Sequence, residues 1–522
     1  MRRVIESDVC IIGSGISAAM VAERLAEETT ASLTVVEAGD DSDPLAQRPA
    51  LRRRFLDYGE SPWRNDHLDG YEVAGIQSRS MQVGGLAMHW GGVTPRFSPE
   101  DFRQQSLYGV GTDWPISYED LDSWYQEAEV RLGVAGEQGP PELDPRGRPF
   151  PLEPLPLTYN LLRLREWTTQ CGIPMWSQPS AKNSVPYRGR PACCRNDSCT
   201  PVCPIGAKYS PDFTWNALRR ANRVRLLPRT VVRRLERDGS GNRISRAVAV
   251  SRDGGPDLEF RARTFVVAGG YVWSSHLLLL SGLANSSGLV GKYLTGHRNV
   301  SGFVSLPLRL YPGMNGQHSL VSKKFMRVPR GEHYLRHDLR VWESAVGREP
   351  RLRDEQGKLL LGDELLADWR RRAATGTARV RAYYDVVPDR ESGLTLDAAK
   401  RNAWGDPLPA LSFRDAPESA AARGWSEEQI RKLFGEMARA GAGEVLSTRS
   451  DSFQDHPAGG CRMGNDSATS VTDAWGRTHD HENLFVAGAP TCVSGGCANA
   501  TLTFCALALR SAAEIGKAFP KQ

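Results

Sequence analysis

Apolar residues follow two spacings along the chain, and together these predict a mixed α/β protein. The apolar run from Asp8 to Ile12 predicts a buried strand, and Ala18 to Ala26 repeats its apolar positions as one face of a helix does. A second apolar run, Leu33 to Val36, predicts another strand. A strand, a helix and a strand in this order predict a βαβ unit with two parallel strands.

The end of the chain returns to the same pattern. An apolar run from Leu484 to Ala487 predicts a buried strand, a glycine-rich turn follows, and Thr501 to Phe519 predicts a closing helix. Between 224 and 267, short apolar runs separated by glycine turns predict a small β-meander beside the first sheet. One domain is therefore expected to draw on both ends of the chain.

The middle of the chain has a different pattern. Ser301 to Leu306 and Arg379 to Val387 alternate as strands do, and the charged stretch 362–372 between them predicts a helix. We assign the region of about 300–450 to a second domain that faces the substrate. The stretch 136–157 is rich in proline and glycine and predicts an extended surface loop.

Composition narrows the possible functions. The 522 residues are 40% apolar, enough for two intertwined domains, and the net charge of +5 comes from interspersed charges, which does not favour a nucleic-acid partner. The most apolar stretch, 265–284, is interrupted by glycine, serine and histidine, so no membrane span is expected. The arginines after Met1 precede too short an apolar run for an export signal. We therefore expect either a cytoplasmic protein or a periplasmic one that is co-exported with a partner.

A dinucleotide-binding fingerprint lies between the first predicted strand and helix. Gly13, Gly15 and Ala18 match G-x-G-x-x-A, in which the first glycine allows a tight turn and the second lets a pyrophosphate approach the backbone. The start of the following helix supplies N–H donors to that anion. Glu37, 24 residues after Gly13 at the end of the next strand, is placed to accept the ribose hydroxyls.

The fingerprint alone does not separate FAD from NAD, because enzymes of both cofactors use it. The late strand ends in a second glycine turn at Gly488 and Ala489. A flavin lying along the sheet would be reached from both ends of the chain, whereas NAD enzymes usually need no such late contact. The sequence therefore favours FAD.

A second glycine-rich segment surrounds a histidine and a tryptophan between 83 and 92. Its candidates for cofactor contact are Gly84, Gly85, His89 and Trp90. Glycines here suit a backbone that passes close to a flat ligand, and we interpret the segment as a wall over the flavin ring. A mobile surface loop is the alternative, which the tryptophan and the apolar flanks disfavour.

Together these motifs resemble the glucose-methanol-choline (GMC) oxidoreductases, FAD enzymes that act on alcohols, over nearly the whole chain. The sequences of Leu107 to Ile116 and of the cysteine segment below are most similar to those of bacterial FAD-dependent glucose dehydrogenase catalytic subunits and glucoside 3-dehydrogenases. Met88-His89-Trp90 resembles the Thr-His-Trp of pyranose oxidases, whose histidine is bonded covalently to FAD. Met88 replaces the threonine, so the resemblance leaves a covalent bond at His89 open.

The resemblance implies an α/β fold in which a Rossmann-like FAD-binding domain is interleaved with a substrate domain built on an antiparallel β-sheet. The implied division is 1–100, 207–299 and 452–522 for the FAD-binding domain, 101–184 and 300–451 for the substrate domain and connecting segments, and 185–206 for a cysteine-rich iron–sulfur loop.

The segment that begins at His456 resembles the family motif His-x-x-Gly-Thr-x-x-Met-Gly, and Asn499 follows 43 residues later. The family places its catalytic pair at these two positions. A neutral imidazole accepts the hydroxyl proton when hydride leaves an alcohol carbon, so His456 is the predicted base. Asn499 is predicted to hold the substrate oxygen by hydrogen bonding. Gly460 and Ala500 depart from the family's Thr and Pro without removing a reacting group, and His297 is expected to be structural.

Four cysteines lie within eleven residues: Cys193, Cys194, Cys199 and Cys203. The loop ends in Cys-Pro, as iron–sulfur loops of ferredoxins do. Zinc prefers two C-x₂-C pairs, which are absent, and two disulfides would strain the adjacent Cys193 and Cys194. Inert buried thiols rarely crowd in this way. We therefore favour an iron–sulfur cluster over these three alternatives.

The flanks of this loop resemble the segment that holds a three-iron (3Fe–4S) cluster in the FAD glucose dehydrogenases. Three thiolates suffice for such a cluster, and from the spacing C-x₅-C-x₃-C we assign Cys193, Cys199 and Cys203, with Cys194 as the alternative to Cys193. A hydride delivers two electrons and a cluster passes one at a time, which implies an outside one-electron acceptor. The resemblance suggests a haem protein (a cytochrome) as acceptor and a small subunit that carries an export signal.

The sequence thus predicts an FAD-dependent sugar dehydrogenase that oxidises C3 of a glucoside or C1 of glucose. The first alternative is an oxidase that reduces oxygen to hydrogen peroxide, as pyranose oxidases do, and aerobic peroxide production separates the two. A non-catalytic binding protein on the same fold is the second alternative, which His456 and Asn499 disfavour.

Overall fold

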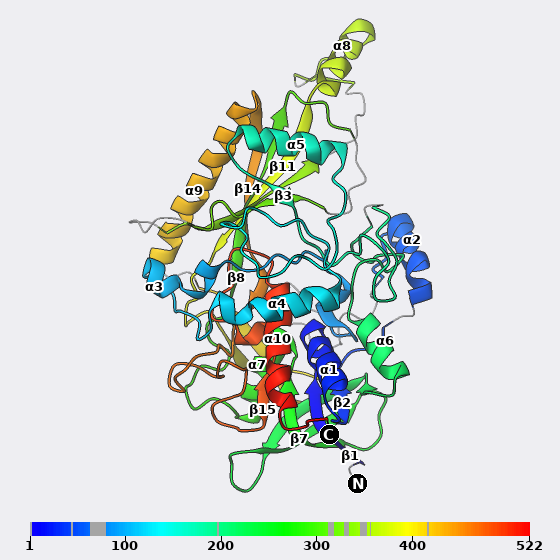
Figure 1. Cartoon of the computed structure of the whole chain (residues 1–522), viewed down its shortest axis with the longest axis vertical. Coiled ribbons are helices and arrows are strands. Elements are labelled where there is room, and N and C mark those ends of the chain that lie inside the picture. Colours follow the sequence, from blue (N-terminus) through cyan, green and yellow to red (C-terminus); the bar gives the residue numbers. More distant parts are fainter. Residues whose placement is uncertain are drawn as a thin grey trace.

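The protein is described from a computed structural model, which covers residues 3–42, 45–62, 80–195, 198–311, 318–327, 334–344, 352–354, 356–414 and 417–521, with the backbone alone at 344, 372, 417–419 and 452–455. Two β-sheets form the centre of the molecule, and helices cover their outer faces (Figure 1).

The strands of the described chain are β1 (Arg3–Ile12), β2 (Leu33–Val36), β3 (Trp176–Ser177), β4 (Arg225–Leu227), β5 (Thr230–Arg237), β6 (Ile244–Ser251), β7 (Leu258–Val267), β8 (Thr295–Leu306), β9 (Leu320–Ser322), β10 (His337–Ser344), β11 (Gly376–Asp385), β12 (Gly393–Arg401), β13 (Pro407–Ser412), β14 (Glu444–Ala458) and β15 (Leu484–Val486).

The α-helices are α1 (Ile16–Glu28), α2 (Arg48–Tyr58), α3 (Gln104–Tyr108), α4 (Tyr118–Leu132), α5 (Tyr159–Gln170), α6 (Asp212–Arg220), α7 (Gly270–Ser281), α8 (Gly362–Ala373), α9 (Pro417–Ala440) and α10 (Thr501–Gly516); short 3₁₀ turns are η1 (Leu45–Gln47), η2 (Gly85–Met88), η3 (Pro99–Phe102) and η4 (Ala489–Thr491).

A seven-stranded sheet combines segments from both ends of the chain. Its order is β4-β2-β1-β7-β6-β5, and β15 pairs with the second half of β7. Strands β1, β2, β4, β7 and β15 run parallel, which confirms the predicted βαβ unit. The meander β5-β6-β7, expected beside this sheet, is part of it, because the first half of β7 pairs with β6 while its other edge pairs with β1 along its length.

The apolar run of β1 is buried on both faces, as parallel strands usually are. Val9 and Ile11 pack into the core shared with α1, α4 and α10, whereas Cys10 and Ile12 pack with residues of α7. Helix α4 therefore shares the core of the first sheet and packs on α10, although it lies in the segment that we assign to the substrate domain. The division into domains stays a prediction.

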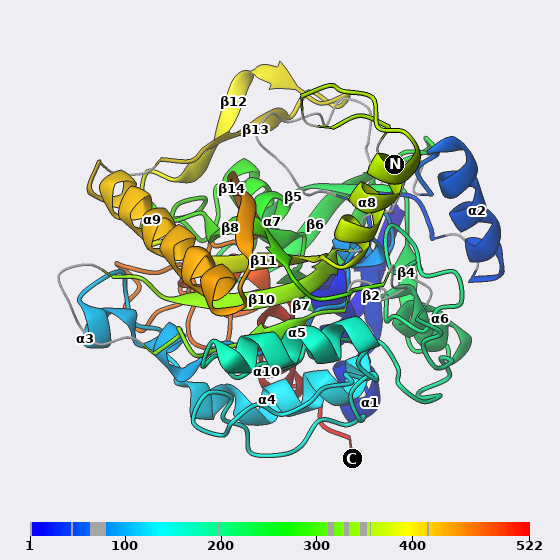
Figure 2. The ribbon, with the colours of Figure 1, turned by 90° about the horizontal axis from the view of Figure 1, so that it is seen from above.

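The second sheet has six strands in the antiparallel order β14-β8-β11-β10-β9-β3. Leu164 and Trp167 of α5 and Phe434 of α9 bury one face of it, and both helices lie along its outer side in Figures 1 and 2. The hairpin β12–β13 stands apart from both sheets (Figure 2). The predicted α/β class, with a parallel sheet and a separate antiparallel sheet, is confirmed.

Candidate active site

The glycine turn after β1 has the geometry that its motif predicts. Gly13 has a φ of +100°, and its N–H donates to the carbonyl of Val36 at 2.8 Å. A Cβ on Gly13 would lie 2.6 Å from the carbonyl oxygen of Ala268, so a side chain does not fit. Gly15 faces open space, because a Cβ there would meet nothing within 4 Å. The backbone at the start of α1 is thus accessible to an anionic ligand.

Glu37 holds this turn from the end of β2. Its Oε2 accepts hydrogen bonds from the backbone N–H of Ser14 at 3.0 Å and from the Ser14 hydroxyl at 2.6 Å, and its Oε1 accepts from the N–H of Gly39 at 2.8 Å. Burial raises the pKa of the Glu37 carboxyl. Glu37 also lines the cavity described next. Its contact with ribose hydroxyls stays a prediction.

A cavity of about 1080 Å³ extends from the glycine turn to the predicted catalytic pair. This is at or above the usual size of a small-molecule site, which fits a dinucleotide together with a substrate. The predicted site residues that line it are Gly13, Gly15, Glu37, Gly85, His89, Trp90, His456, Ala489 and Asn499. The other predicted site residues do not line it: Ala18, Gly84 and Gly488, and the three cysteines Cys193, Cys199 and Cys203.

The glycine-rich His-Trp loop packs directly on the glycine turn. The N–H of Gly84 donates to the hydroxyl of Ser14 at 3.2 Å, and a Cβ on Gly85 would lie 3.2 Å from the Cα of Gly15. The Trp90 indole donates to the carbonyl of Tyr209 at 2.8 Å, which fixes its ring at the cavity wall. The loop is therefore a built wall of the cavity rather than a surface excursion.

The predicted catalytic pair, separated by 43 residues, meets in the cavity. Asn499 Nδ2 lies 2.8 Å from His456 Nε2. His456 has a φ of +55° near the end of β14, and the turn behind it needs glycine: a Cβ on Gly459 would lie 2.2 Å from the carbonyl oxygen of Tyr293. The strained backbone aims the imidazole at Asn499.

His297 makes a contact that the sequence did not reveal. Its Nε2 lies 3.0 Å from His456 Nδ1, so His297 belongs to the site and not only to the scaffold. An amide nitrogen only donates, so Nε2 of His456 accepts from Asn499. The ring proton of His456 must therefore be on Nδ1, from which it is donated to His297. This leaves Nε2 as the basic nitrogen that faces the cavity.

Electrostatics keep both rings neutral. Burial, and then the nearby Arg340 guanidinium, lower the pKa of His456 to about 3. Burial and the charge of His456 and Arg340 hold the pKa of His297 well below its usual range. A neutral imidazole is the form that accepts a proton, so His456 is ready to act as a base across the physiological pH range.

The far end of the cavity is lined by side chains of the six-stranded sheet, which sequence reasoning missed: Phe303, Arg340, Trp342, Arg379, Arg381 and Tyr383. Arg340 faces Arg381, and Trp342 faces Arg379, across the β10–β11 ladder. Directly opposed residues share one face of a sheet. The strand alternation indicated which residues share a face, but not that this face meets the cavity.

The cysteine loop lies beside the cavity wall and not in it. All ten cysteines are free thiols, Cys199 and Cys203 are buried, Cys193 is half-buried and Cys194 is exposed. Burial raises the pKa of Cys193, and the charges of Cys199 and Cys203 act in the same direction. Among the described residues, the cysteine sulfurs do not converge as the ligands of a single metal ion do. Residues 196–197 of this loop lie outside the described chain.

A buried lysine joins this loop to the His-Trp loop. The Lys208 ammonium donates to the carbonyls of Trp90 and of Cys199, and burial lowers its pKa to about 7. Val202 of the cysteine loop packs on Met88 of the His-Trp loop. The cysteine loop therefore contacts the wall of the cavity through both polar and apolar groups.

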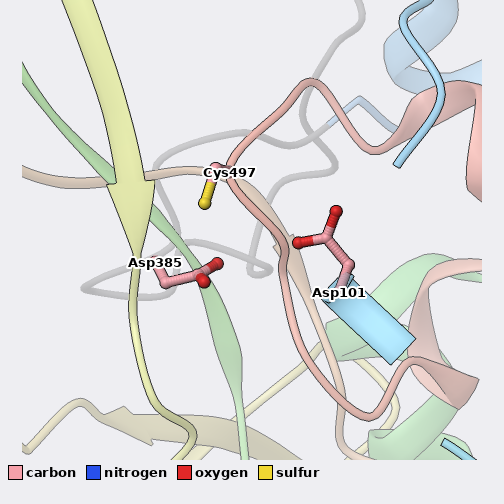
Figure 3. A group of neighbouring side chains, drawn as sticks. All are labelled: Asp101, Asp385 and Cys497. Atoms are coloured by element: carbon pink, nitrogen blue, oxygen red, sulfur yellow. The ribbon is translucent and has the colours of Figure 1, made fainter. Parts of the chain in front are cut away.

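One other group of metal-ligand side chains is present in the described chain. Asp101, Asp385 and Cys497 point toward one another outside the cavity lining (Figure 3). The guanidinium of Arg336 pairs with both carboxylates, at 2.8 Å from Asp101 and 3.1 Å from Asp385, and Cys497 donates to the Arg336 carbonyl. The group is an ion-pair cluster that fixes the loop before Asn499.

Comparison with known proteins agrees with this geometry. Residues 187–299 and 388–508 match the two family models of the GMC oxidoreductases. The fructose dehydrogenase large subunit of Gluconobacter japonicus is 30% identical over 98% of this chain and 98% of its own length. The 6'''-hydroxyparomomycin C oxidase of Streptomyces lividus is 30% identical over 97% of this chain and 91% of its own.

Among solved structures, a formate oxidase of Aspergillus oryzae superimposes with a TM-score of 0.63 over 99% of both chains, at 16% identity, which supports the fold. Within the described residues no helix has both the length and the apolar character needed to cross a bilayer. The nearer resemblance to glucose dehydrogenases and glucoside 3-dehydrogenases stays a prediction, whereas the family itself is confirmed. The chain is a member of the GMC oxidoreductases, FAD-binding enzymes that oxidise CH–OH donors.

Proposed function

We propose that this GMC oxidoreductase is an FAD-dependent sugar dehydrogenase in which His456 removes the proton of a sugar hydroxyl. The observation that carries the proposal is the 2.8 Å contact between His456 Nε2 and Asn499 Nδ2 in the cavity that also contains the glycine turn. A base and a hydrogen-bond donor at one point are what oxidation of an alcohol requires.

An alcohol that enters between the two side chains replaces their mutual hydrogen bond. Its hydroxyl donates to His456 Nε2 and accepts from Asn499 Nδ2. The O–H bond then breaks with its proton on Nε2, while the C–H bond electrons leave with the hydrogen and a carbonyl forms. Bound FAD supplies the acceptor for that hydride. The proton of Nδ1 stays hydrogen-bonded to His297 throughout.

A sugar is the proposed substrate class, at C3 of a glucoside or C1 of glucose. The two relatives named above carry the names of their substrates, fructose in one and 6'''-hydroxyparomomycin C in the other, and fructose is a sugar. The substrate end of the cavity offers Trp342 and Tyr383 for stacking and arginine donors for hydroxyl groups, a combination that suits polyols.

We further propose that electrons leave through a 3Fe–4S cluster held by Cys193, Cys199 and Cys203. Cys193 is half-buried and the charges of Cys199 and Cys203 act on it, whereas Cys194 is exposed, which supports this choice. Thiolates that bind different irons lie farther apart than ligands of one ion, so a cluster does not require these sulfurs to converge on one point. The buried Lys208, which donates to the backbone carbonyl of Cys199, adds a positive charge that favours anionic sulfur nearby.

Such a cluster needs a one-electron acceptor, and we propose a haem protein together with a small signal-bearing subunit. The name of the Gluconobacter relative includes the words large subunit, which supports a multi-subunit enzyme. An oxidase that forms hydrogen peroxide is the second candidate, because the Streptomyces relative bears the name of an oxidase.

An anaerobic visible spectrum of the purified, iron-reconstituted protein tests the proposal, recorded before and after adding glucose and then a methyl glucoside. Flavin bleaching is expected with one of them, and His456→Gln is expected to slow it about 10²- to 10⁴-fold with FAD still bound. His479→Gln, a histidine outside the cavity lining, is the matched control and should bleach at about the parental rate.

Iron–sulfur absorbance is expected in the same spectrum and should be lost in Cys203→Ser but kept in Cys194→Ser. Bleaching at an undiminished rate in His456→Gln would refute the base. A flavin that no sugar bleaches would refute the substrate class, and rapid peroxide formation in air would establish the oxidase instead.

A further inference from the structure

The substrate end of the cavity carries the positive charge of two neighbouring arginines of β11. Arg379 and Arg381 lie on β11 two residues apart, and their side chains line the cavity. Neither forms an ion pair with a carboxylate in the part of the chain that the structure describes. Arginines at half-buried positions are usually paired, so this arrangement needs an explanation.

The neighbouring charged groups on this sheet do form pairs. Arg340 makes a two-pronged contact with Asp338, at 2.9 and 3.0 Å, and Arg449 on β14 pairs with Asp451 at 2.9 Å. Glu343 lies at the cavity edge one position past Trp342, where it accepts from the hydroxyl of Thr158 on the helix side of the sheet at 3.1 Å. The excess charge is therefore located on Arg379 and Arg381.

Both guanidiniums are oriented by their neighbours. Arg381 donates from Nε to Ser301 and from Nη1 to Tyr383, each at 2.8 Å, which leaves its second terminal nitrogen for another acceptor. The guanidinium carbons of Arg379 and Arg381 each lie 5.7 Å from the ring centroid of Trp342. The Nε of Arg379 is buried and has no hydrogen-bond partner.

This pair is adjacent to the catalytic histidines. Tyr383, which accepts from Arg381, has its ring 4.8 Å from that of His297, and His297 contacts His456. Burial and the charge of Arg381 lower the pKa of Arg379, so the charged pair carries a cost, which Asp451, already paired with Arg449, only partly offsets. An anion between the two guanidiniums would remove that cost.

We infer that the substrate is an anionic sugar, whose carboxylate or phosphate group binds Arg379 and Arg381 while a hydroxyl group meets His456 and Asn499. The inference deepens the proposed function and rests on it. Guanidinium groups recognise carboxylate and phosphate through paired N–H donors, and such charge-assisted hydrogen bonds are about twice as strong as neutral ones. Trp342 offers the sugar ring a stacking surface between them.

Anaerobic flavin reduction by matched sugars tests the inference on the holoenzyme. The neutral sugars are glucose, fructose and methyl glucoside, and the charged ones are glucuronate, gluconate and glucose 6-phosphate. The rate constant divided by the half-saturating concentration is expected to be about 10- to 100-fold higher for a charged sugar. The carboxylate and phosphate compounds show which anion is preferred.

The variants locate the effect. Arg379→Gln is expected to bring the ratio of charged to neutral sugars close to one, and Arg379→Lys, which keeps the charge without the fork, to give an intermediate ratio. The control is Arg439→Gln on α9, an exposed arginine outside the cavity lining, whose ratio should stay at the parental value.

Two failures are distinguishable. If neutral sugars reduce the flavin as well as or better than every charged sugar, the inference is overturned while the proposed function stands. If no sugar of either set reduces it, the proposed function fails, and the inference that rests on it fails as well. If Arg379→Gln still prefers charged sugars over neutral ones as the parental enzyme does, the assignment to this arginine pair is also overturned.

Discussion

At the scale of single residues, the direction of two hydrogen bonds decides which nitrogen of His456 is basic. Because Asn499 donates to Nε2, the proton must be on Nδ1, and His297 must accept it. His297 is a positioning residue, since it acts on the substrate only through His456. Without an acceptor at that point, the ring would be free to place its proton on Nε2 and lose the base.

Replacement of His297 tests this role. His297→Phe removes the acceptor and is expected to slow flavin reduction by sugar about 100-fold, because the wrong tautomer of a catalytic histidine loses its base function. His297→Gln retains an acceptor and should recover part of the rate, with the half-saturating concentration little changed in both. Equal loss in the two variants, or loss that follows thermal stability, would assign His297 to the scaffold instead.

Sequence reasoning placed the pair but not its surroundings. His456 and Asn499 were recognisable because each lies in a local motif, and the structure brings them to 2.8 Å. His297 carries no local signal of its role, since its contact depends on the pairing of β8 with β14. Arg379 and Arg381 were missed for a similar reason, because strand alternation does not say which face of a sheet borders a cavity.

At the scale of elements, the Arg336 cluster connects parts of the chain that are distant in sequence. Asp101 lies in η3, Asp385 is the last residue of β11, and Cys497 belongs to the loop that carries Asn499. All members are buried, and burial raises the pKa of Asp101 to about 6 despite the adjacent guanidinium. The position of the catalytic amide therefore depends on a charged contact outside the cavity.

Loss of that contact should cost stability. Arg336→Met leaves two buried carboxylates unpaired and is expected to lower the free energy of unfolding by about 3–5 kcal/mol in urea denaturation. Arg327→Met removes the neighbouring half-exposed pair with Glu100 and should cost no more than about 1 kcal/mol. Equal effects of the two substitutions would show that the buried cluster holds nothing in place.

The predicted elements were the strongly patterned ones, and several helices were missed. Helix α4 had a usable signal, because Ser117 and Asp120 form a capping box and its buried residues repeat with helical spacing. Helix α9 is long and mostly polar, and only Ile430, Phe434 and Met437 mark its buried face. Few apolar positions in a charged stretch give a weak periodicity, so packing on the sheet decides its structure.

At the scale of the whole molecule, the protein folds around buried neutral histidines. Burial lowers the pKa to about 3 for His318, His337 and His456, and His297 is also well below its usual range. In the unfolded chain each would titrate near 6.5. Below that pH the unfolded state binds protons that the folded state does not, so stability is lost as pH falls toward the folded pKa.

The free energy of unfolding is therefore expected to fall between pH 6.5 and 4, by about 1.4 kcal/mol per pH unit for each of these histidines. Asp101 opposes part of the loss, because its raised pKa makes the folded state bind a proton more tightly. Urea denaturation at pH 7, 6 and 5 measures the slope. His318→Gln should make it shallower by about one proton, and a stability that is level from pH 7 to 5 would contradict the assignment.

The position of β7 between β1 and β15 has a consequence for biosynthesis. As the chain leaves the ribosome, the first βαβ unit emerges early. Its sheet lacks β15, and α1 lacks the helix that packs on it, α10, until residues 484–516 have been made. Asn499 and Ala489 of the cavity wall arrive in the same late segment. The cavity is therefore complete only once this late segment has been made and has packed against the first βαβ unit.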